Sequence, residues 1–410
     1  MSTTLVQTTA RKAKQHWFLV VLAIIAVVSL VRIVTDTDDI SSAGTIRAAI
    51  IAICPILMAA LGGLWAERAG VVNIGLEGQM ILGTWGAAFF AYHGGPWAGV
   101  VGAALFGILG GLLHAVATVT FGVDHIVSGV AINLIGGGAA TFLAEAIFSD
   151  LEGGGPNQLI GLESPTKITV PGISDASLDL AERGWFFVSD VAAFVGALTT
   201  SLSTLSIVVF ALVAISAWVL WRTPFGLRLR SCGENPQAAE TLGVNVYLYK
   251  YIAVLVSGGL AGIGGGFLAL VASSGFNTGQ TGGRGFIGLV AMIFGNWRPG
   301  GLLAGALTFG YTDALRLRNS DAVHALLLLL AIGLLAYAAY RAVSGNLRAA
   351  VGIGVVGALL LVWYLGTETV PRDFTSMTPY VTTLLVLALG AQRLRMPAAD
   401  GRPYRKGSAG

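Results

Sequence analysis

About twelve long apolar runs divide this chain, and they constrain its fold more than any other feature. Most are close to the roughly 20 residues that an α-helix needs to cross the hydrocarbon layer of a bilayer. The chain is 55% hydrophobic and only 11% charged, whereas a soluble globular protein carries about 25% charged residues. These properties predict an all-α polytopic membrane protein. The predicted spans lie at about 17–34, 44–64, 71–92, 97–120, 126–148, 204–221, 250–272, 284–295, 301–316, 322–340, 348–366 and 379–392.

An even number of spans places both ends of the chain on the same side of the membrane. We predict a cytoplasmic N-terminus at 1–16, a transmembrane domain at 17–392 and a cytoplasmic tail at 393–410. With this threading, sixteen of the 24 Lys and Arg residues lie in loops assigned to the cytoplasm, in agreement with the positive-inside rule. The short run 284–295 is counted as a span, with a half-helix or a re-entrant segment as the alternatives.

Two loops are long enough to have a role of their own. Residues 149–203 are predicted to be extracytoplasmic and carry seven acidic residues against Lys167 and Arg183. They form either a solvated loop with an interfacial piece near 185–195, or a docking surface for an extracytoplasmic partner. The second loop, 222–249, is predicted to be cytoplasmic.

The sequence lacks the motifs of the common self-contained enzymes. It has no Walker A pattern, no HExxH and no GxSxG, so neither P-loop ATP hydrolysis nor zinc-protease or serine-hydrolase chemistry is predicted. A GxGxxG at Gly352, Gly354 and Gly357 lies inside an apolar run and not after a strand, which favours helix packing over dinucleotide binding. Packing is also the interpretation for glycines with GxxxG spacing. These are Gly107/Gly111, Gly258/Gly262/Gly266 and Gly301/Gly305.

Composition removes two further classes of site. The five histidines are scattered, and Cys54 lies in an apolar run while Cys232 lies in a basic loop, so we predict no metal site and no disulfide. The net charge of +3 is too small for a nucleic-acid footprint. No catalytic residue, metal ligand or cofactor is therefore predicted in this chain.

Polar side chains inside the third predicted span are candidates for a substrate pathway. Asn73, Glu77 and Gln79 enter this span, with Asn73 and Glu77 one turn apart on a single helical face. Gly75 and Gly78 flank Glu77, which would weaken the helix there, and transporters place substrates at such interruptions. The alternative is a hydrogen-bond network that only orders the bundle.

The fifth predicted span offers the same choice at two positions. Asn133 and Glu145 are polar residues within this span. Each side chain would either line a pathway or pair with a neighbouring helix.

The cytoplasmic loop contains start and stop signals for a short helix. Asn235 is suited to the N-cap, Pro236 to the first helical position and Gly243 to the end. We therefore predict a two-turn helix at 236–242. Ala238 and Ala239 would fit a partner's groove, and Glu234 and Glu240 would pair with basic residues on its rim.

The loop resembles the coupling loop of bacterial ABC-importer permeases of the branched-chain amino acid and simple-sugar class. The similar residues are Arg222-Thr-Pro-Phe-Gly-Leu-Arg-Leu-Arg230 and Gly233-Glu-Asn-Pro-Gln-Ala-Ala-Glu-Thr-Leu-Gly-Val244. Four other segments resemble the nucleoside-importing branch of the class. They are 67–80, 124–133, 283–287 and 294–297.

The resemblance covers about 44–318 and 379–406, and it implies a type II ABC importer permease-like bundle. It implies that Asn235 to Gly243 form the coupling helix. The implied partners are a second permease subunit, homologous or identical, a cytoplasmic ABC ATPase that carries ATP-Mg, and an extracytoplasmic substrate-binding lipoprotein. The chain departs from the pattern at 321–366, where two additional runs predict an extra hairpin on a ten-helix core.

The predicted function is that of a non-catalytic permease subunit that translocates nucleosides across the bacterial cytoplasmic (inner) membrane. A simple-sugar or branched-chain amino acid permease is the alternative within the class. An ion-coupled secondary transporter, with Glu77 or Glu145 as the coupling carboxylate, is the alternative from another class. The expected contacts are a small-molecule substrate and membrane lipid, with no nucleic acid.

Overall fold

The computed structural model describes residues 22–318, 320–371 and 394–407. The predicted N-terminal segment 1–16 and the last predicted span, 379–392, lie outside the described residues. Contacts divide the chain into two compact units. The first unit falls within Met1–Ala48, Ile168–Leu202 and Thr312–Pro379, and the second within Ala49–Lys167, Ser203–Tyr311 and Tyr380–Gly410.

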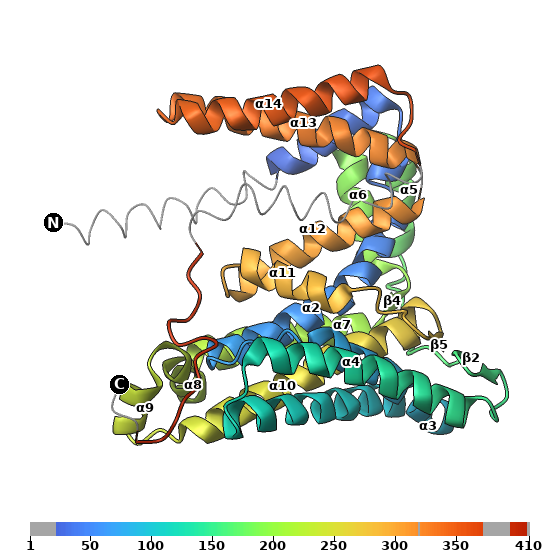
Figure 1. The fold of residues 1–410 in the computed structure, drawn as a ribbon. Helices are drawn as coiled ribbons and strands as arrows, with labels where there is room; N and C mark the ends of the chain where they lie inside the picture. The colour runs from blue at the N-terminus through green and yellow to red at the C-terminus, as the bar shows by residue number, and fades with distance from the viewer. Residues whose placement is uncertain (1–21, 319, 372–393, 408–410) are drawn as a thin grey trace. The chain divides into compact units, whose positions relative to one another are not determined.

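Helices form most of the described chain, and two small sheets lie between them (Figure 1). The N-terminal helical segments are Leu22–Thr35, η1 Asp38–Ile40, α2 Ala43–Arg68, α3 Leu76–Ala115, η2 Val116–Thr120, α4 His125–Leu143 and η3 Ala144–Phe148. The central helices are α5 Ile173–Glu182, α6 Val188–Thr199, α7 Thr204–Arg222, α8 Pro224–Glu234, α9 Pro236–Thr241, α10 Val246–Phe267 and η4 Leu268–Ala272. The later helices are α11 Arg284–Phe294, α12 Pro299–Arg318, α13 Ser320–Val343 and α14 Leu347–Gly366. The strands are β1 Gly154–Gly155, β2 Gln158–Ile160, β3 Lys167–Ile168, β4 Leu202–Ser203 and β5 Gly275–Asn277, in sheets of order β1-β2-β5 and β3-β4.

The predicted spans 71–92 and 97–120 correspond to two antiparallel helices within α3 and η2. As one straight helix, their 45 residues would be about 68 Å long, more than twice the hydrocarbon thickness. The backbone turns at Gly95, which has φ 79° and ψ 177°. A Cβ added to Gly86 would lie 2.6 Å from the carbonyl oxygen of Gly102. The two halves therefore pack against each other as a hairpin.

Seven described helical stretches are long and apolar enough to cross a membrane when α3 and η2 are taken as one. The shorter apolar helices are Leu22–Thr35, α6 and α11. The run 284–295 thus forms the 11-residue α11, which is shorter than a complete span. The architecture is that of an all-α polytopic membrane protein.

Glycines bring α3 and α10 into close contact, as the GxxxG spacing predicts (Figure 1). A Cβ on Gly107 would lie 2.2 Å from the carbonyl oxygen of Gly258, and a Cβ on Gly262 equally close to that of Ala103. Only residues without a side chain allow these backbones to approach so closely. The packing interpretation of Gly107, Gly258 and Gly262 is confirmed.

An aromatic cluster fills the end of the second unit beside the three-stranded sheet. The ring of Trp85 stacks on Phe89 and Phe148, with centroids 5.2 and 5.5 Å apart. Phe276, from β5, meets Phe148 edge to face, and Leu159 opposite it on β2 is fully buried. The sheet therefore extends the hydrophobic core beyond the helices.

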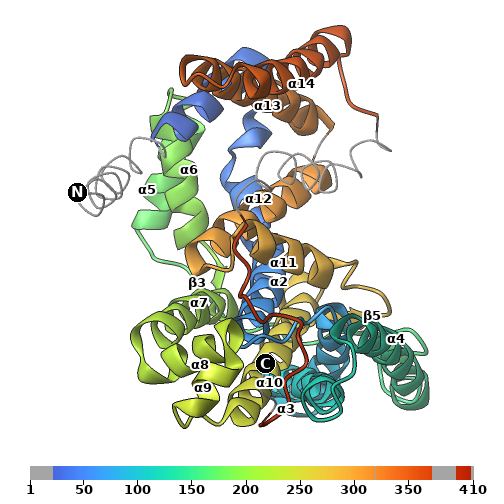
Figure 2. The ribbon, with the colours of Figure 1, turned by 60° about the vertical axis from the view of Figure 1, so that its left-hand side comes forward.

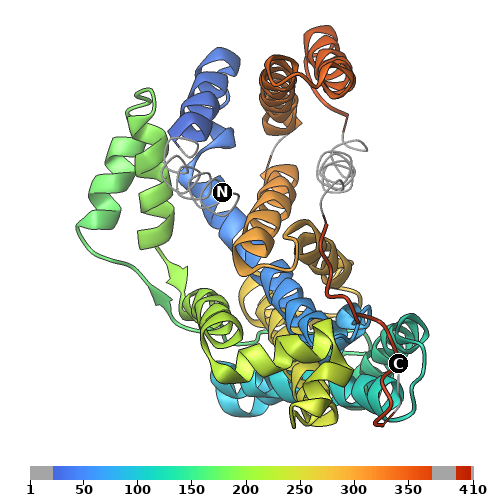
Figure 3. The same ribbon diagram turned by 90° about the vertical axis from the view of Figure 1, so that its left-hand side faces the viewer.

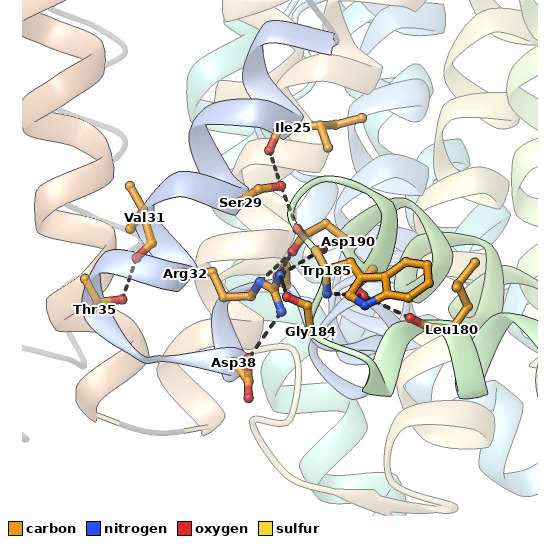
Figure 4. A network of polar contacts seen from close by, with 12 residues as sticks. Ile25, Ser29, Val31, Arg32, Thr35, Asp38, Leu180, Gly184, Trp185 and Asp190 are labelled. Carbon is orange, nitrogen blue, oxygen red and sulfur yellow. Dashed lines mark hydrogen bonds and ion pairs between the residues drawn. The ribbon is translucent and has the colours of Figure 1, made fainter.

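The residues of the predicted loop 149–203 include two packed helices, α5 and α6, which Figure 3 shows in green. Helix α6 overlaps the amphipathic piece predicted near 185–195. A buried network joins α6 to the N-terminal helix (Figure 4). Asp190 accepts hydrogen bonds from Ser29 and Ser41 and pairs with Arg32, whose Nε lies 3.2 Å from its carboxylate. This part of the loop is therefore ordered core.

The extra runs 322–340 and 348–366 form α13 and α14, which pack as a hairpin in the first unit (Figure 3, in orange). Gly357 lies where the two helices touch, because a Cβ added to it would be 3.2 Å from the Cβ of Leu334. Gly352 has open space around it. Helix packing therefore explains the third glycine of the GxGxxG pattern and not the first.

Candidate functional site

The polar cluster lies at a break between α2 and α3. Helix α2 ends at Arg68 and α3 begins at Leu76, so residues 69–75 are not helical. The prediction that Asn73 and Glu77 share a helical face is therefore wrong. Gly70 has φ 81°, which ends α2, and hydrogen bonds from other helices hold the extended residues that follow.

Asn73 and Gln79 form one buried polar group with a third residue that sequence reasoning missed. The Asn73 amide donates to Gln79 Oε1 at 3.0 Å and to Ser257 Oγ at 2.9 Å. All three side chains are fully buried. Ser257 lies on α10 and resembles any other serine of an apolar span, so only the fold identifies it.

Glu77 caps a helix more than two hundred residues away in the sequence. Its two carboxylate oxygens accept from the backbone N–H groups of Gly283 and Gly285, at 2.9 and 2.7 Å. These donors lie at the N-terminus of α11, where N–H groups have no partner within the helix and a negative charge is favourable. A Cβ on Gly285 would lie 2.6 Å from the backbone of Glu77. The contact therefore requires glycine.

Asn133 connects α4 to the same break. Its side chain accepts from Gly78 N at 2.8 Å and donates to the carbonyl of Ile74 at 3.1 Å. It therefore satisfies backbone groups where the helix starts. Glu145, in contrast, is exposed on η3 and does not belong to this cluster.

Two histidines, which the sequence analysis left without a role, hold the backbone of Val72. His125 Nδ1 accepts from Val72 N at 3.1 Å, and His114 Nε2 donates to Val72 O at 3.0 Å. The other ring nitrogen of His114, Nδ1, forms a hydrogen bond of 2.8 Å with Ser128 Oγ. Because its Nδ1 accepts from a backbone N–H, the His125 imidazole is neutral in this arrangement. No sequence signal connects these histidines to the break.

The predicted cytoplasmic helix is present as α9, directly after a second helix, α8. Asn235 caps α9 by accepting from Ala238 N at 3.0 Å, Pro236 occupies the first turn, and Gly243 has φ 79°. The helix ends at Thr241, one residue before the predicted end. Local capping chemistry thus located this element closely.

The prediction that both Ala238 and Ala239 fit a partner's groove requires correction at Ala239. Ala239 is only 2% exposed and packs with Cys232 and Val246 of the same chain, because residues 236 and 239 lie on the side that faces the protein. Ala238 is exposed, and Leu242, just after the helix, is 85% exposed.

The two acidic residues of this region bind other parts of the same chain. Glu234 lies 3.6 Å from Arg68, and Glu240 accepts a hydrogen bond from Tyr404 Oη at 2.6 Å. Both carboxylates therefore have contacts within their own chain, and their pairing with a partner's basic residues stays a prediction.

The site holds small polar groups and offers no catalytic chemistry. Among the described residues, no three His, Cys, Asp or Glu side chains could together hold a metal ion. Cys54 and Cys232 are both buried and free, and burial raises the pKa of the Cys232 thiol to about 11. The site offers amides, hydroxyls, two imidazoles, the Glu77 carboxylate and backbone groups, which can bind a polar solute or hold helices together.

A family model described as branched-chain amino acid transport system / permease component matches residues 45–336. The chain is 34% identical to the guanosine ABC transporter permease protein NupQ of Bacillus subtilis over 370 residues, 88% of this chain and 96% of the relative. It is 35% identical to the nucleoside ABC transporter permease protein NupC of Lactococcus lactis, over 86% of this chain and 93% of the relative. It is 32% identical to the putative glucose ABC transporter permease protein TsgC13 of Haloferax volcanii, over 68% and 79%. No solved structure matches the chain.

Proposed function

Because the chain belongs to the branched-chain amino acid transport system / permease component family, we propose that it is the membrane-spanning subunit of an importer for nucleosides. Permeases of this family are non-catalytic subunits of ABC transporters that work with an ATPase and a substrate-binding protein. The observation that carries the nucleoside assignment is identity of 34–35% to two nucleoside permeases over almost their whole length. A sugar is the second candidate, because a relative named for glucose is 32% identical.

We place the translocation path beside the break before α3. The break supplies Asn73, and α3, α4 and α10 supply Gln79, Asn133 and Ser257, whose amide and hydroxyl groups both donate and accept hydrogen bonds. A nucleoside carries ribose hydroxyls and ring nitrogens that can exchange bonds with such groups. Glu77 contributes by holding α11 against α3.

We place the ATPase contact on the exposed side of α8 and α9. In this proposal, closure of the ATPase, which carries ATP-Mg, displaces α9, and α8 and α10 transmit the displacement to the path. The contact surface consists of Asn235, Ala238 and Leu242. Pro236 and Ala239 lie on the buried side of the helix, and Gly243 turns the chain just after its end.

The remaining assignments follow the resemblance of the sequence motifs. The protein is placed in the bacterial inner membrane with both termini in the cytoplasm. Its partners are a homologous or identical permease, a cytoplasmic ATPase dimer and an extracytoplasmic lipoprotein that delivers the substrate.

The test of the substrate is stimulation of ATP hydrolysis in the reconstituted complex. With the binding protein present, guanosine or another nucleoside should stimulate hydrolysis, and glucose or leucine at equal concentration should not. Stimulation by glucose alone would replace the nucleoside assignment with the sugar assignment.

A further inference from the structure

The C-terminal segment, residues 394–407, belongs neither to the proposed path nor to the proposed ATPase contact. It contains no helix or strand and runs past α8, α9 and α10, in red in Figure 1 and Figure 2. It lies beyond the part of the chain that the family model matches, 45–336. Its contacts nevertheless lie on the elements that carry the proposed ATPase contact.

One set of contacts fixes the segment to α8 and α9. Ala399 N donates to Gly233 O at 2.9 Å, and Ala398 N donates to Glu234 Oε2 at 3.3 Å. Tyr404 Oη donates to Glu240 at 2.6 Å. The segment thus binds the end of α8 and the C-terminal end of α9.

The ring of Tyr404 also supports the buried side of α9. It packs beside the cluster of Cys232, Ala239 and Val246, and it lies 5.3 Å from the ring of Tyr247 on α10. With six residues, α9 is too short to be stable alone. Its position therefore depends on what packs beneath it, and Tyr404 is part of that support.

A second set of contacts fixes the segment to the cytoplasm-assigned ends of other helices. Arg395 N donates to Asn296 Oδ1 at 2.7 Å, in the turn between α11 and α12. Asp400 is 6% exposed and lies beside Glu67 at the end of α2 and Lys250 of α10, close enough for both groups to affect its pKa. The segment therefore connects α9 to α2 and to the α11–α12 turn.

We propose that residues 394–407 are a strap that positions α9, with Tyr404 and Asp400 as its positioning residues. This inference rests on the proposed function, in which α9 receives the motion of the ATPase. The strap makes α9 move together with the end of α2 and the α11–α12 turn, so displacement of a six-residue helix reaches the ends of two membrane helices.

The test of the strap is hydrogen exchange of 236–243 in the purified full-length protein, which needs no partner. Tyr404→Phe removes one hydrogen bond and keeps the ring, and should speed exchange roughly threefold to tenfold. Glu240→Ala should have the same effect, Glu240→Gln should behave like the wild type because it keeps an acceptor, and the double variant Tyr404→Phe/Glu240→Ala should not exceed either single variant. Lys406→Ala, at an exposed position of the same segment, is the control and should change nothing.

The assembled transporter provides the second readout. Tyr404→Phe should raise the ATP hydrolysed per nucleoside transported, leaving the KM for nucleoside and the amount of inserted protein unchanged. Exchange that stays at the wild-type rate in both Tyr404→Phe and Glu240→Ala would overturn the strap. Faster exchange with an unchanged ratio would support the strap and contradict the proposed role of α9 instead.

Discussion

At the scale of single residues, Glu77 has the most specific environment in the candidate site. Its carboxylate satisfies two backbone N–H groups at the start of α11, and Gly285 leaves room for it. A side chain in this position has a structural role whether or not a substrate passes nearby. Substitutions of Glu77 therefore need a measurement of stability beside transport.

Glu77→Leu should destabilise the protein strongly. It leaves two buried donors without partners, at roughly 1–3 kcal/mol each, while Glu77→Gln keeps one acceptor and should lose about half as much. Thermal unfolding in detergent measures both variants. An unchanged melting temperature for Glu77→Leu would show that the cap contributes nothing, and a transport defect would then report on the path alone.

Asp400 should make the strap sensitive to pH. Burial raises the pKa of Asp400 from 3.8 to about 7, and the charged groups facing it are Glu67 and Arg68 on α2 and Lys250 on α10. The pKa is higher in the docked state, so its contribution to docking is complete below about 3.8 and is lost as the pH rises through about 7. Between these two pH values docking should weaken by up to about tenfold per pH unit, and above about 7 it should weaken no further.

The measurement is hydrogen exchange of 236–243 at pH 6 and pH 8, corrected for the intrinsic exchange rate. We expect faster exchange at pH 8 in the wild type. Asp400→Asn, which cannot ionise, should show no such difference. The same pH response in Asp400→Asn would assign the effect to another group.

At the scale of elements, α9 has one face for its own chain and one for a partner. Ala238→Arg adds a long cation to the exposed face and should reduce co-purification of the ATPase at least tenfold, with an unchanged melting temperature. Ala239→Arg places the same side chain in the buried cluster and should lower the melting temperature through clash and buried charge. Normal ATPase binding and transport by Ala238→Arg would remove this face from the contact.

The contact between α3 and α10 should be intolerant of added methyl groups. Gly107→Ala would bring a Cβ within 2.2 Å of the Gly258 carbonyl and should cost about 1–3 kcal/mol. Gly138→Ala on α4 meets open space and should be neutral or slightly stabilising, because alanine favours helix. Equal melting temperatures for the two variants would mean that the backbones can separate freely.

Local chemistry predicts elements well and their surroundings poorly. Asn235, Pro236 and Gly243 located α9 to within one residue because capping depends on neighbours in the sequence. The orientation of Ala239 was beyond such reasoning, since a six-residue helix has too few turns to show a periodic apolar face. The place of Asn73 outside α3, and the roles of His114 and Ser257, depend on side chains far away in the sequence, which no local pattern encodes.

At the scale of the whole molecule, the chain is a multi-pass permease that needs other subunits to use energy. Its sequence has no ATP-binding motif, and its family works with a separate ATPase. The extra α13–α14 hairpin lies mostly beyond the matched range, which ends at 336.

The central claim is ATP-driven nucleoside import through this subunit, and uptake of labelled guanosine into proteoliposomes tests it most directly. We predict uptake only when the permease pair, the ATPase, the binding protein and Mg-ATP are all present, with no effect of a proton uncoupler. Guanosine uptake by this subunit alone, driven by an ion gradient and abolished by the uncoupler, would contradict the account and identify a secondary transporter.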